Sequence, residues 1–373
     1  MPYLDHASIS PITPEVAAAI ASAPSEDPTR LHAGARRARQ ALDAARATCA
    51  ASIGGRAEEV TFTSGGTEGV VLAVTSAVLA ARAARRPLRI VASAIEQRSL
   101  LETAASFPDV ELISLGVDAH GLVDPAALEA AIGDGAALVA IQVANLEIGT
   151  VQPLAELTAR RGAWLLADAS AAAGWIPLDV STLGVDLLTV SGSRAGGPAG
   201  TGFVWTRSGV RLRPMLRGDD RERGVRAGMP NLPGLVGLAA GLRARIDALP
   251  DAEPRMRALT EHLRAQLPTV LDEVIVHGHP QRRVPHIVSF SIPLVEGDAL
   301  LLGLDARGFA VHSGSACTSS TAEPSHVLAA IGTLTHGAIR VSIGPETTAA
   351  DLDAFVAALP EVVDAAKARL GRR

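Results

Sequence analysis

The chain has 373 residues, of which 48% are hydrophobic and only 3% aromatic, and a formal net charge of −5 at pH 7. This length can hold more than one domain and a sizeable core, which must be built from Ala, Val, Leu and Ile. The charges form no basic patch, which argues against a nucleic-acid partner, and two cysteines in so long a chain indicate a reducing compartment rather than a disulfide framework. The N-terminus shows no signal-peptide pattern and no apolar run approaches the ~18 residues of a membrane span, so we expect a cytoplasmic protein without membrane contact.

Short apolar strands alternate with helices through the first two thirds of the chain. Helices are expected at residues 14–23, 31–52 and 67–85. Strands are expected at 59–63, 88–92, 111–114, 138–142, 164–167, 187–190 and 202–206. This alternation predicts an α/β fold with a mostly parallel sheet that carries helices on both faces.

A smaller α+β domain is expected towards the C-terminus. A long helical region, 233–267, is interrupted in the sequence near Leu249 and Pro250, which we take as the link between the domains. Beyond it, strands are expected near 273–277, 286–292, 309–312 and 338–343, and helices near 297–306, 323–331 and 348–369. The predicted division is a large domain, 15–248, and a small domain made of 1–14 and 249–373.

The stretch TSGGTE, residues 63–68, joins an expected strand to an expected helix. Backbone amides at a helix N-terminus, together with hydroxyl groups and glycines that permit close approach, form an anion site. Gly66 and Thr67 are the candidate ligands. The alternative is an ordinary glycine-rich turn in which Thr67 caps the helix.

Polar residues also follow two later strands, at the sheet edge where open α/β sheets collect their ligands. Asp168 ends the apolar strand in LLADAS, and a capping role in the next turn is its alternative. The stretch DLLTVSGSRAGGPAGTG, 186–202, places Ser191, Ser193 and Arg194 at the end of a second strand.

The stretch HSGSACTSS, 312–320, surrounds Cys317 with small, flexible, polar residues. Such a setting is poorly suited to core packing and suits a thiol that moves between sites and accepts sulfur. The ordinary alternative, a small buried cysteine, fits Cys49 on its Ala-rich helix far better.

These motifs resemble, over essentially the whole chain, those of the cysteine desulfurases, class V pyridoxal-phosphate (PLP) enzymes, in their nitrogen-fixation and housekeeping type. The resemblance implies a fold-type I PLP-transferase fold and a thiol, Cys317, that carries sulfur as a persulfide. It also implies roles for the other matched positions: Gly66, Thr67, Ser191 and Ser193 at the cofactor phosphate, Gln97 and Asp168 at the pyridine ring, Asn145 at the phenolic oxygen and the substrate, and Arg340 at the substrate carboxylate. No metal site is expected.

The sequence departs from this family pattern at the cofactor. Arg194 replaces the Schiff-base lysine, and a guanidinium with a pKa above ~12 is no nucleophile at neutral pH. The family's ring-stacking and phosphate-binding histidines are Gln97 and Ser193, and the only lysine of the chain is Lys367. Further departures are His6 for an asparagine, Ala171 for a glutamine, and Arg226-Ala227-Gly228-Met229 for the segment that sends a threonine across the dimer interface. We therefore expect covalent PLP catalysis to be lost, with PLP bound non-covalently or absent.

Three functions stay open at this point. The first is a desulfurase-like sulfurtransferase that takes sulfur from a small donor such as cysteine and passes it to an acceptor protein. The second is a non-catalytic pseudoenzyme that binds a true desulfurase or a sulfur acceptor, and the third is a PLP enzyme that works in an unusual mode. In each case the resemblance implies a homodimer or a heterodimer with a related protein.

Overall fold

The computed structural model describes residues 2–157, 162–313 and 324–370. Its larger sheet has seven strands in the order β1-β7-β6-β5-β4-β2-β3. Their bounds are β1 Val60–Thr63, β2 Arg89–Ser93, β3 Glu111–Leu115, β4 Leu138–Ala140, β5 Trp164–Asp168, β6 Leu187–Ser191 and β7 Gly202–Thr206. The block from β3 to β6 pairs in parallel, and β7 runs antiparallel to both of its neighbours. The predicted mostly parallel α/β sheet is confirmed.

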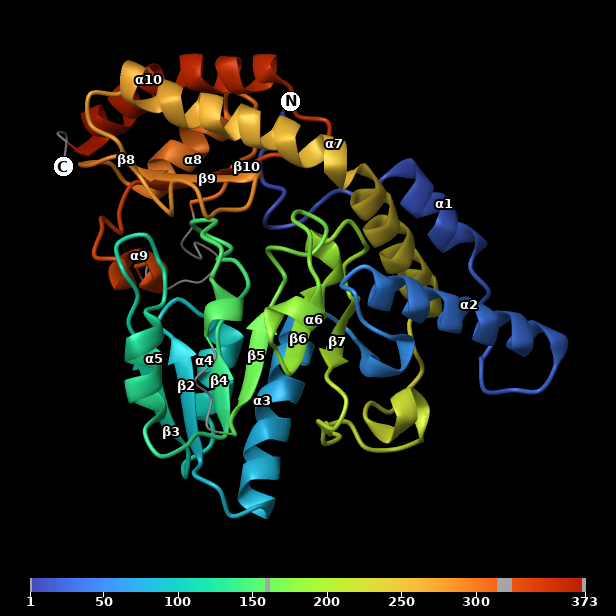
Figure 1. Ribbon diagram of the computed structural model, residues 1–373. Coiled ribbons are helices and arrows are strands. Elements are labelled where there is room, and N and C mark those ends of the chain that lie inside the picture. Colours follow the sequence, from blue (N-terminus) through green and yellow to red (C-terminus); the bar gives the residue numbers. More distant parts are fainter. Residues whose placement is uncertain (1, 158–161, 314–323, 371–373) are drawn as a thin grey trace.

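Successive residues of each central strand enter different cores, as the pleat requires. In β5, Leu165 belongs to one apolar cluster and Leu166 to another. Helix α3, Gly66–Ala83, packs in the second cluster, whereas α2, Ala33–Ala51, packs in the first, so the two faces carry different helices (Figure 1). Shorter helices of this region are α1 Pro14–Ser22, α4 Arg98–Ala105, α5 Pro125–Ile132 and α6 Val180–Leu183, with 3₁₀ turns η1 Ala57–Glu59, η2 Leu154–Glu156, η3 Gly192–Arg194 and η4 Arg221–Gly224.

Helix α3 corrects the expectation that no apolar segment approaches the length of a membrane span. Among the described residues it is the one helix long and apolar enough, by length and composition alone, to cross a membrane. Its apolar side chains are instead used in the core, where Val70, Val74 and Val78 are fully buried.

The smaller sheet is antiparallel, in the order β10-β9-β8. Its strands are β8 Ile275–Val276, β9 Ile287–Ser291 and β10 Ala338–Ser342, and its helices are α8 Gly297–Asp305, α9 His326–Ala330 and α10 Ala349–Leu370. The expected strand at 309–312 is wrong, because this segment makes only isolated bridges, Tyr3 with Ala310 and His312 with Arg340. The N-terminal segment thereby joins the small sheet.

Helix α7, Leu232–Val270, is continuous over 39 residues, so the predicted interruption near Leu249 is also wrong. Pro250 and Pro254 each remove one backbone hydrogen bond. Buried side chains nevertheless hold the helix against both parts of the protein, Leu238 in the core of the large sheet and Met256 in that of the small sheet. Figure 1 shows α7 passing from beside α1 and α2 to the layer it shares with α10 over the small sheet. The division into 15–248 and the remainder stays a prediction.

Candidate functional site

A cavity of about 170 Å³ lies at the carboxyl ends of the parallel strands, where β10 and the start of α9 approach the large sheet. Five of the predicted site residues line it: Gln97, Asn145, Asp168, Arg194 and Arg340. The sequence separates these residues by up to 243 positions. The large sheet brings four of them together because each ends or follows a different parallel strand, and the small sheet adds Arg340 from β10.

Asp168, at the end of β5, is buried and accepts four hydrogen bonds from the chain itself. Its Oδ1 accepts from the Ser170 amide at 3.0 Å, the Ser170 hydroxyl at 2.6 Å and the Thr189 hydroxyl at 3.1 Å. Its Oδ2 accepts from Gln97 Nε2 at 2.5 Å. The Gln97 amide therefore donates to the carboxylate at which the resemblance places a protonated ring nitrogen.

Arg194 lies in η3, directly after β6, and faces the N-terminal segment. Its Nε donates to the Ala7 carbonyl at 3.1 Å, and its own carbonyl accepts from Trp175 Nε1 at 3.0 Å. Burial lowers the pKa of the Arg194 guanidinium, and the nearby Asp168 carboxylate opposes that shift. The side chain is a fixed cation at the cavity wall.

Arg340 reaches the cavity from β10, and two of its three partners lie more than 300 positions away in the chain. One Nη donates to Asp5 at 2.8 Å and Ser8 at 2.6 Å, and the other donates to the Leu146 carbonyl at 3.1 Å. Its buried Nε has no hydrogen-bond partner among the described residues.

The Asn145 side chain makes most of its hydrogen bonds within its own turn. Its Oδ1 accepts from the amides of Glu147 at 2.8 Å and Ile148 at 2.9 Å, and its Nδ2 donates to the Ile95 carbonyl at 3.2 Å.

Two further carboxyls, Glu96 and Glu147, line the same cavity and were not predicted from the sequence. Glu96 Oε1 accepts from Ser93 Oγ and from the Gln142 amide, both at 2.8 Å, while Glu147 Oε2 accepts from Ser325 Oγ at 2.9 Å. Burial raises the pKa of Glu96 to about 8 and that of Glu147 to about 7. The available signal was an acidic residue inside an apolar run, at Ile95-Glu96 and in the stretch LEI at 146–148.

The predicted anion site forms a cradle beside this cavity without lining it. Gly66 begins α3, and a Cβ there would meet Ser170 Oγ at 2.9 Å and Ser191 Cβ at 3.3 Å. The Ser191 and Ser193 hydroxyls lie 3.3 Å apart. The alternative role for Thr67 as the cap is wrong, because the N-cap is Gly65 and Thr67 lies in the first turn with an exposed side chain.

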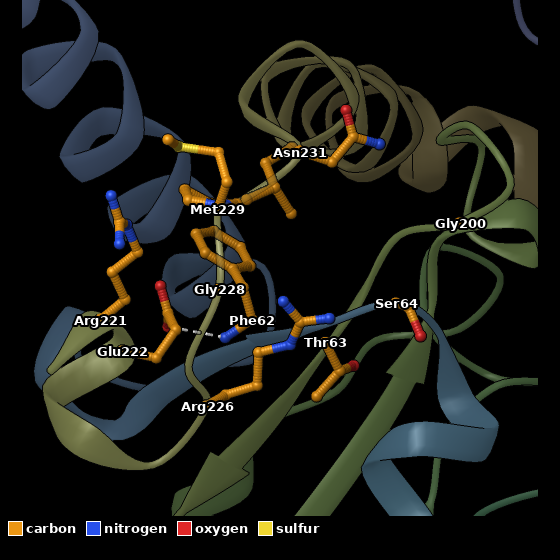
Figure 2. A pocket seen from close by; sticks show the side chains of 12 residues that line it. Phe62, Thr63, Ser64, Gly200, Arg221, Glu222, Arg226, Gly228, Met229 and Asn231 are labelled. Carbon is orange, nitrogen blue, oxygen red and sulfur yellow. Dashed lines mark hydrogen bonds between the residues drawn. The ribbon is translucent and has the colours of Figure 1, made fainter. Parts of the chain in front are cut away.

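The segment 226–231 borders a second, smaller hollow of about 120 Å³ next to this cradle (Figure 2). Arg226 Nε donates to Glu68 at 3.0 Å, and the Ser64 amide donates to the other oxygen of the same carboxylate at 2.8 Å. Met229 is 56% exposed at the rim. Arg226 is thus tied to the first turn of α3.

Cys317 lies outside the described residues, but the described residues on either side of its segment contact the cavity wall. His312 pairs with Arg340 through two backbone hydrogen bonds, of 3.2 and 2.6 Å. On the other side, His326 Nε2 lies 2.8 Å from the Glu96 carbonyl. Burial and the neighbouring Arg340 lower the pKa of His312 to about 4, so at neutral pH this histidine is uncharged and cannot serve as a cation for the thiol. Cys49 is fully buried, and burial raises the pKa of its thiol to about 12.

The described residues fit only part of a PLP molecule. The cradle at Gly66 and the paired serine hydroxyls suit a phosphate. The other end does not fit a Schiff-base cofactor, because Arg194 follows β6 and Gln97 binds Asp168. The only lysine of the sequence, Lys367, lies exposed on α10. No catalytic step through this cofactor follows from these residues.

The chain matches the family model described as Aminotransferase class-V over residues 2–355. It is 34% identical to cysteine desulfurase IscS 1 of Archaeoglobus fulgidus, with 98% of this chain and 97% of that protein covered. It is 38% identical to a cysteine desulfurase of Cereibacter sphaeroides, covering 98% and 96% of the two chains. The solved structure of a NifS-like protein superposes with a TM-score of 0.89 at 26% identity, over 97% of this chain and 99% of that one.

Proposed function

The chain belongs to the class V aminotransferase family, and we propose that it is a divergent sulfurtransferase of the cysteine desulfurase kind that moves sulfur on Cys317 without PLP Schiff-base chemistry. The observation that carries the proposal is the pairing of Gln97 with Asp168 beside Arg194. Gln97 donates a hydrogen bond to one oxygen of Asp168, and Arg194 stands where the resemblance places the Schiff-base lysine. Sulfur mobilisation itself is supported by the relatives, which are named cysteine desulfurases.

The proposed step is an exchange between a thiolate and a persulfide. The Cys317 thiolate attacks the outer sulfur of a small persulfide donor, such as cysteine persulfide; the S–S bond of the donor breaks and the donor leaves as a thiolate. The new S–S bond leaves Cys317 as a persulfide, which a thiolate of an acceptor protein takes up in the same way. Sulfur, charge and protons balance without an added oxidant or reductant.

Arg340 supplies the cation that this step uses. A guanidinium near a thiol favours the thiolate, and the described end of the Cys317 segment is paired with the Arg340 backbone. His312 is uncharged at neutral pH, so in this proposal Arg340 is the cation that favours the thiolate.

We further propose that the protein forms a homodimer, or a heterodimer with a related chain, through the segment 226–231. The support is the resemblance, in which this segment lies at the subunit interface; Met229 within it is 56% exposed. Sedimentation at micromolar concentration tests it: a monomer, alone and with a related desulfurase, would remove the proposal.

The loss of the Schiff base is tested by incubation with PLP, borohydride reduction and mass spectrometry. We expect residues 186–202 to stay unmodified, and the absorbance spectrum to lack an aldimine band. A reduced pyridoxyl adduct in that segment would contradict the proposal.

The sulfur-carrying role is tested with a small persulfide donor and mass mapping of the two cysteines. Cys317 should load while Cys49, with its buried thiol, should not. Cys317→Ser should abolish transfer and leave thermal unfolding unchanged, and Cys49→Ser is the matched control. Full transfer by Cys317→Ser would favour instead a non-catalytic protein that binds a true desulfurase.

A further inference from the structure

A further cavity lies where the N-terminal segment meets the starts of α1 and α10. Its volume is about 680 Å³, which is within the roughly 300–1,000 Å³ typical of small-molecule sites. It shares no lining residue with the cavity at Asp168. The proposed sulfur transfer therefore does not account for it.

The charged side chains that line this cavity are acidic. They are Glu15 in the first turn of α1, Glu346 in the loop before α10 and Asp351 in the first turn of α10. Hydrogen bonds from threonines at the two helix starts lower the pKa of Glu15 and of Asp351, so both are ionised at neutral pH. Among the described residues that line the cavity, none is a lysine or an arginine. The charges favour a cation.

Two arginines lie near the cavity without lining it. Arg255 donates to the Thr347 carbonyl at 2.9 Å, and Arg245 lies over the Trp175 ring, 3.9 Å from its centroid. Arg245 is close enough to interact electrostatically with Glu346. One such cation leaves three carboxylates in excess, so the cavity stays negative.

His6 adds a hydrogen-bonding atom that the chain does not satisfy. This residue lines the cavity and is 6% exposed, and its buried Nδ1 has no hydrogen-bond partner among the described residues. Gly344 admits the ring, because a Cβ at that position would clash with the imidazole. Burial lowers the pKa of His6 to about 4, so at neutral pH the ring is uncharged and one nitrogen can accept a hydrogen bond. An ammonium group, which only donates, can pair with this atom and with the carboxylates alike.

The rest of the lining indicates the shape of the cation. Pro11, Ile12 and Pro14 form an apolar part of the wall, and Ile12 is 43% exposed. Within the described part of the chain, no three His, Cys, Asp or Glu side chains come together as they would around a metal ion. The negative charges are therefore spread along the wall. An apolar wall with spread carboxylates suits an alkyl chain that carries several ammonium groups.

We propose that this cavity binds an aliphatic polyamine. Its ammonium groups pair with Glu15, Glu346 and Asp351. One of them also donates to His6 Nδ1, and the methylene groups lie against Ile12. This binding site goes beyond the sulfur transfer proposed above and does not depend on it.

The test is calorimetric titration of the full chain with spermidine, a linear polyamine, at neutral pH and about 0.1 M salt, where exposed charges are screened beyond roughly 10 Å. Saturable binding of one spermidine per chain is expected. Mg²⁺ at the same concentration should not displace it, because the carboxylates do not gather around one point. Trilysine, whose backbone adds bulk, should bind more weakly.

Two variants probe the two kinds of contact. Glu346→Gln should weaken spermidine binding about fivefold, as expected for one ion pair near the surface. Glu102→Gln, at an exposed position of α4, is the matched control and should bind as wild type does. His6→Phe keeps an aromatic ring but removes both nitrogens, and should weaken binding roughly tenfold. Thermal unfolding shows whether His6→Phe is folded; if it is not, the exposed Glu346→Gln decides.

Four results would each overturn the inference. They are the absence of saturable binding, displacement by an equal concentration of Mg²⁺, tighter binding of trilysine than of spermidine, and unchanged affinity in Glu346→Gln or in folded His6→Phe. Displacement by Mg²⁺ would indicate a diffuse layer of counterions, and tighter trilysine binding would indicate a basic protein segment. Glu346→Gln should still load Cys317 from a persulfide donor, so failure of sulfur transfer and failure of polyamine binding are observed separately.

Discussion

Replacing Glu96 by glutamine should remove a pH dependence of stability that the wild-type protein carries. Glu96 is buried, and its pKa rises from the ordinary value of 4.5 to about 8. Above pH 4.5 the unfolded chain releases this proton while the folded protein keeps it. The folded state then binds more protons than the unfolded state, so stability falls as pH rises between about 4.5 and 8.

The magnitude follows from one proton per molecule, which corresponds to ~1.4 kcal/mol per pH unit. Between about pH 5.5 and pH 7.5, wild type should lose about 2–3 kcal/mol more unfolding free energy than Glu96→Gln. The glutamine oxygen can still accept from Ser93 and Gln142, so the variant keeps the two hydrogen bonds that Glu96 makes. Glu147 titrates in both proteins and its contribution cancels in the comparison.

Urea unfolding at several pH values measures this difference. The denaturant slope must be the same in both proteins, which shows that the same cooperative transition is compared. Glu102→Gln, at an exposed position, is the control and should follow wild type. Parallel pH profiles for wild type and Glu96→Gln would refute the reasoning, because they would mean that Glu96 titrates normally in the folded protein.

Three further outcomes are expected. Arg194→Lys alone should give no brisk cysteine desulfuration with added PLP, because Gln97 still binds the carboxylate at the ring site; rapid turnover in an alanine- and sulfide-release assay would show that the Gln97 contact is unimportant. Glu222→Ala should lower the unfolding free energy in urea by about 3–5 kcal/mol, since it leaves the buried Arg46 cation without its 2.6 Å ion pair; a loss under about 1 kcal/mol would mean that the pair is well solvated. Cys49 should resist iodoacetamide until the protein unfolds, because its thiol is buried with a pKa of about 12; labelling at the same rate as an exposed thiol would contradict this.

The sequence alone predicted the class of fold and most of the residues that line the cavity. Apolar strands alternate with helices at short intervals, and this pattern depends on neighbouring residues, so it can be read without the structure. The polar residue at the end of each strand, such as Asp168, predicted the cavity because parallel strands bring their carboxyl ends to one edge. The replacement of the family lysine by Arg194 is likewise a fact of the sequence.

The tertiary structure decided which atoms are paired. The contact of Gln97 with Asp168 joins residues 71 positions apart, and that of Arg340 with Asp5 joins residues 335 apart. Neither follows from local pattern, because the geometry of a loop depends on what packs against it. The continuity of α7 through Pro250 was decided in the same way, by side chains buried far from the proline. Likewise, burial of one oxygen each on Glu96 and Glu147 depends on the walls of the cavity, which only the folded chain brings together.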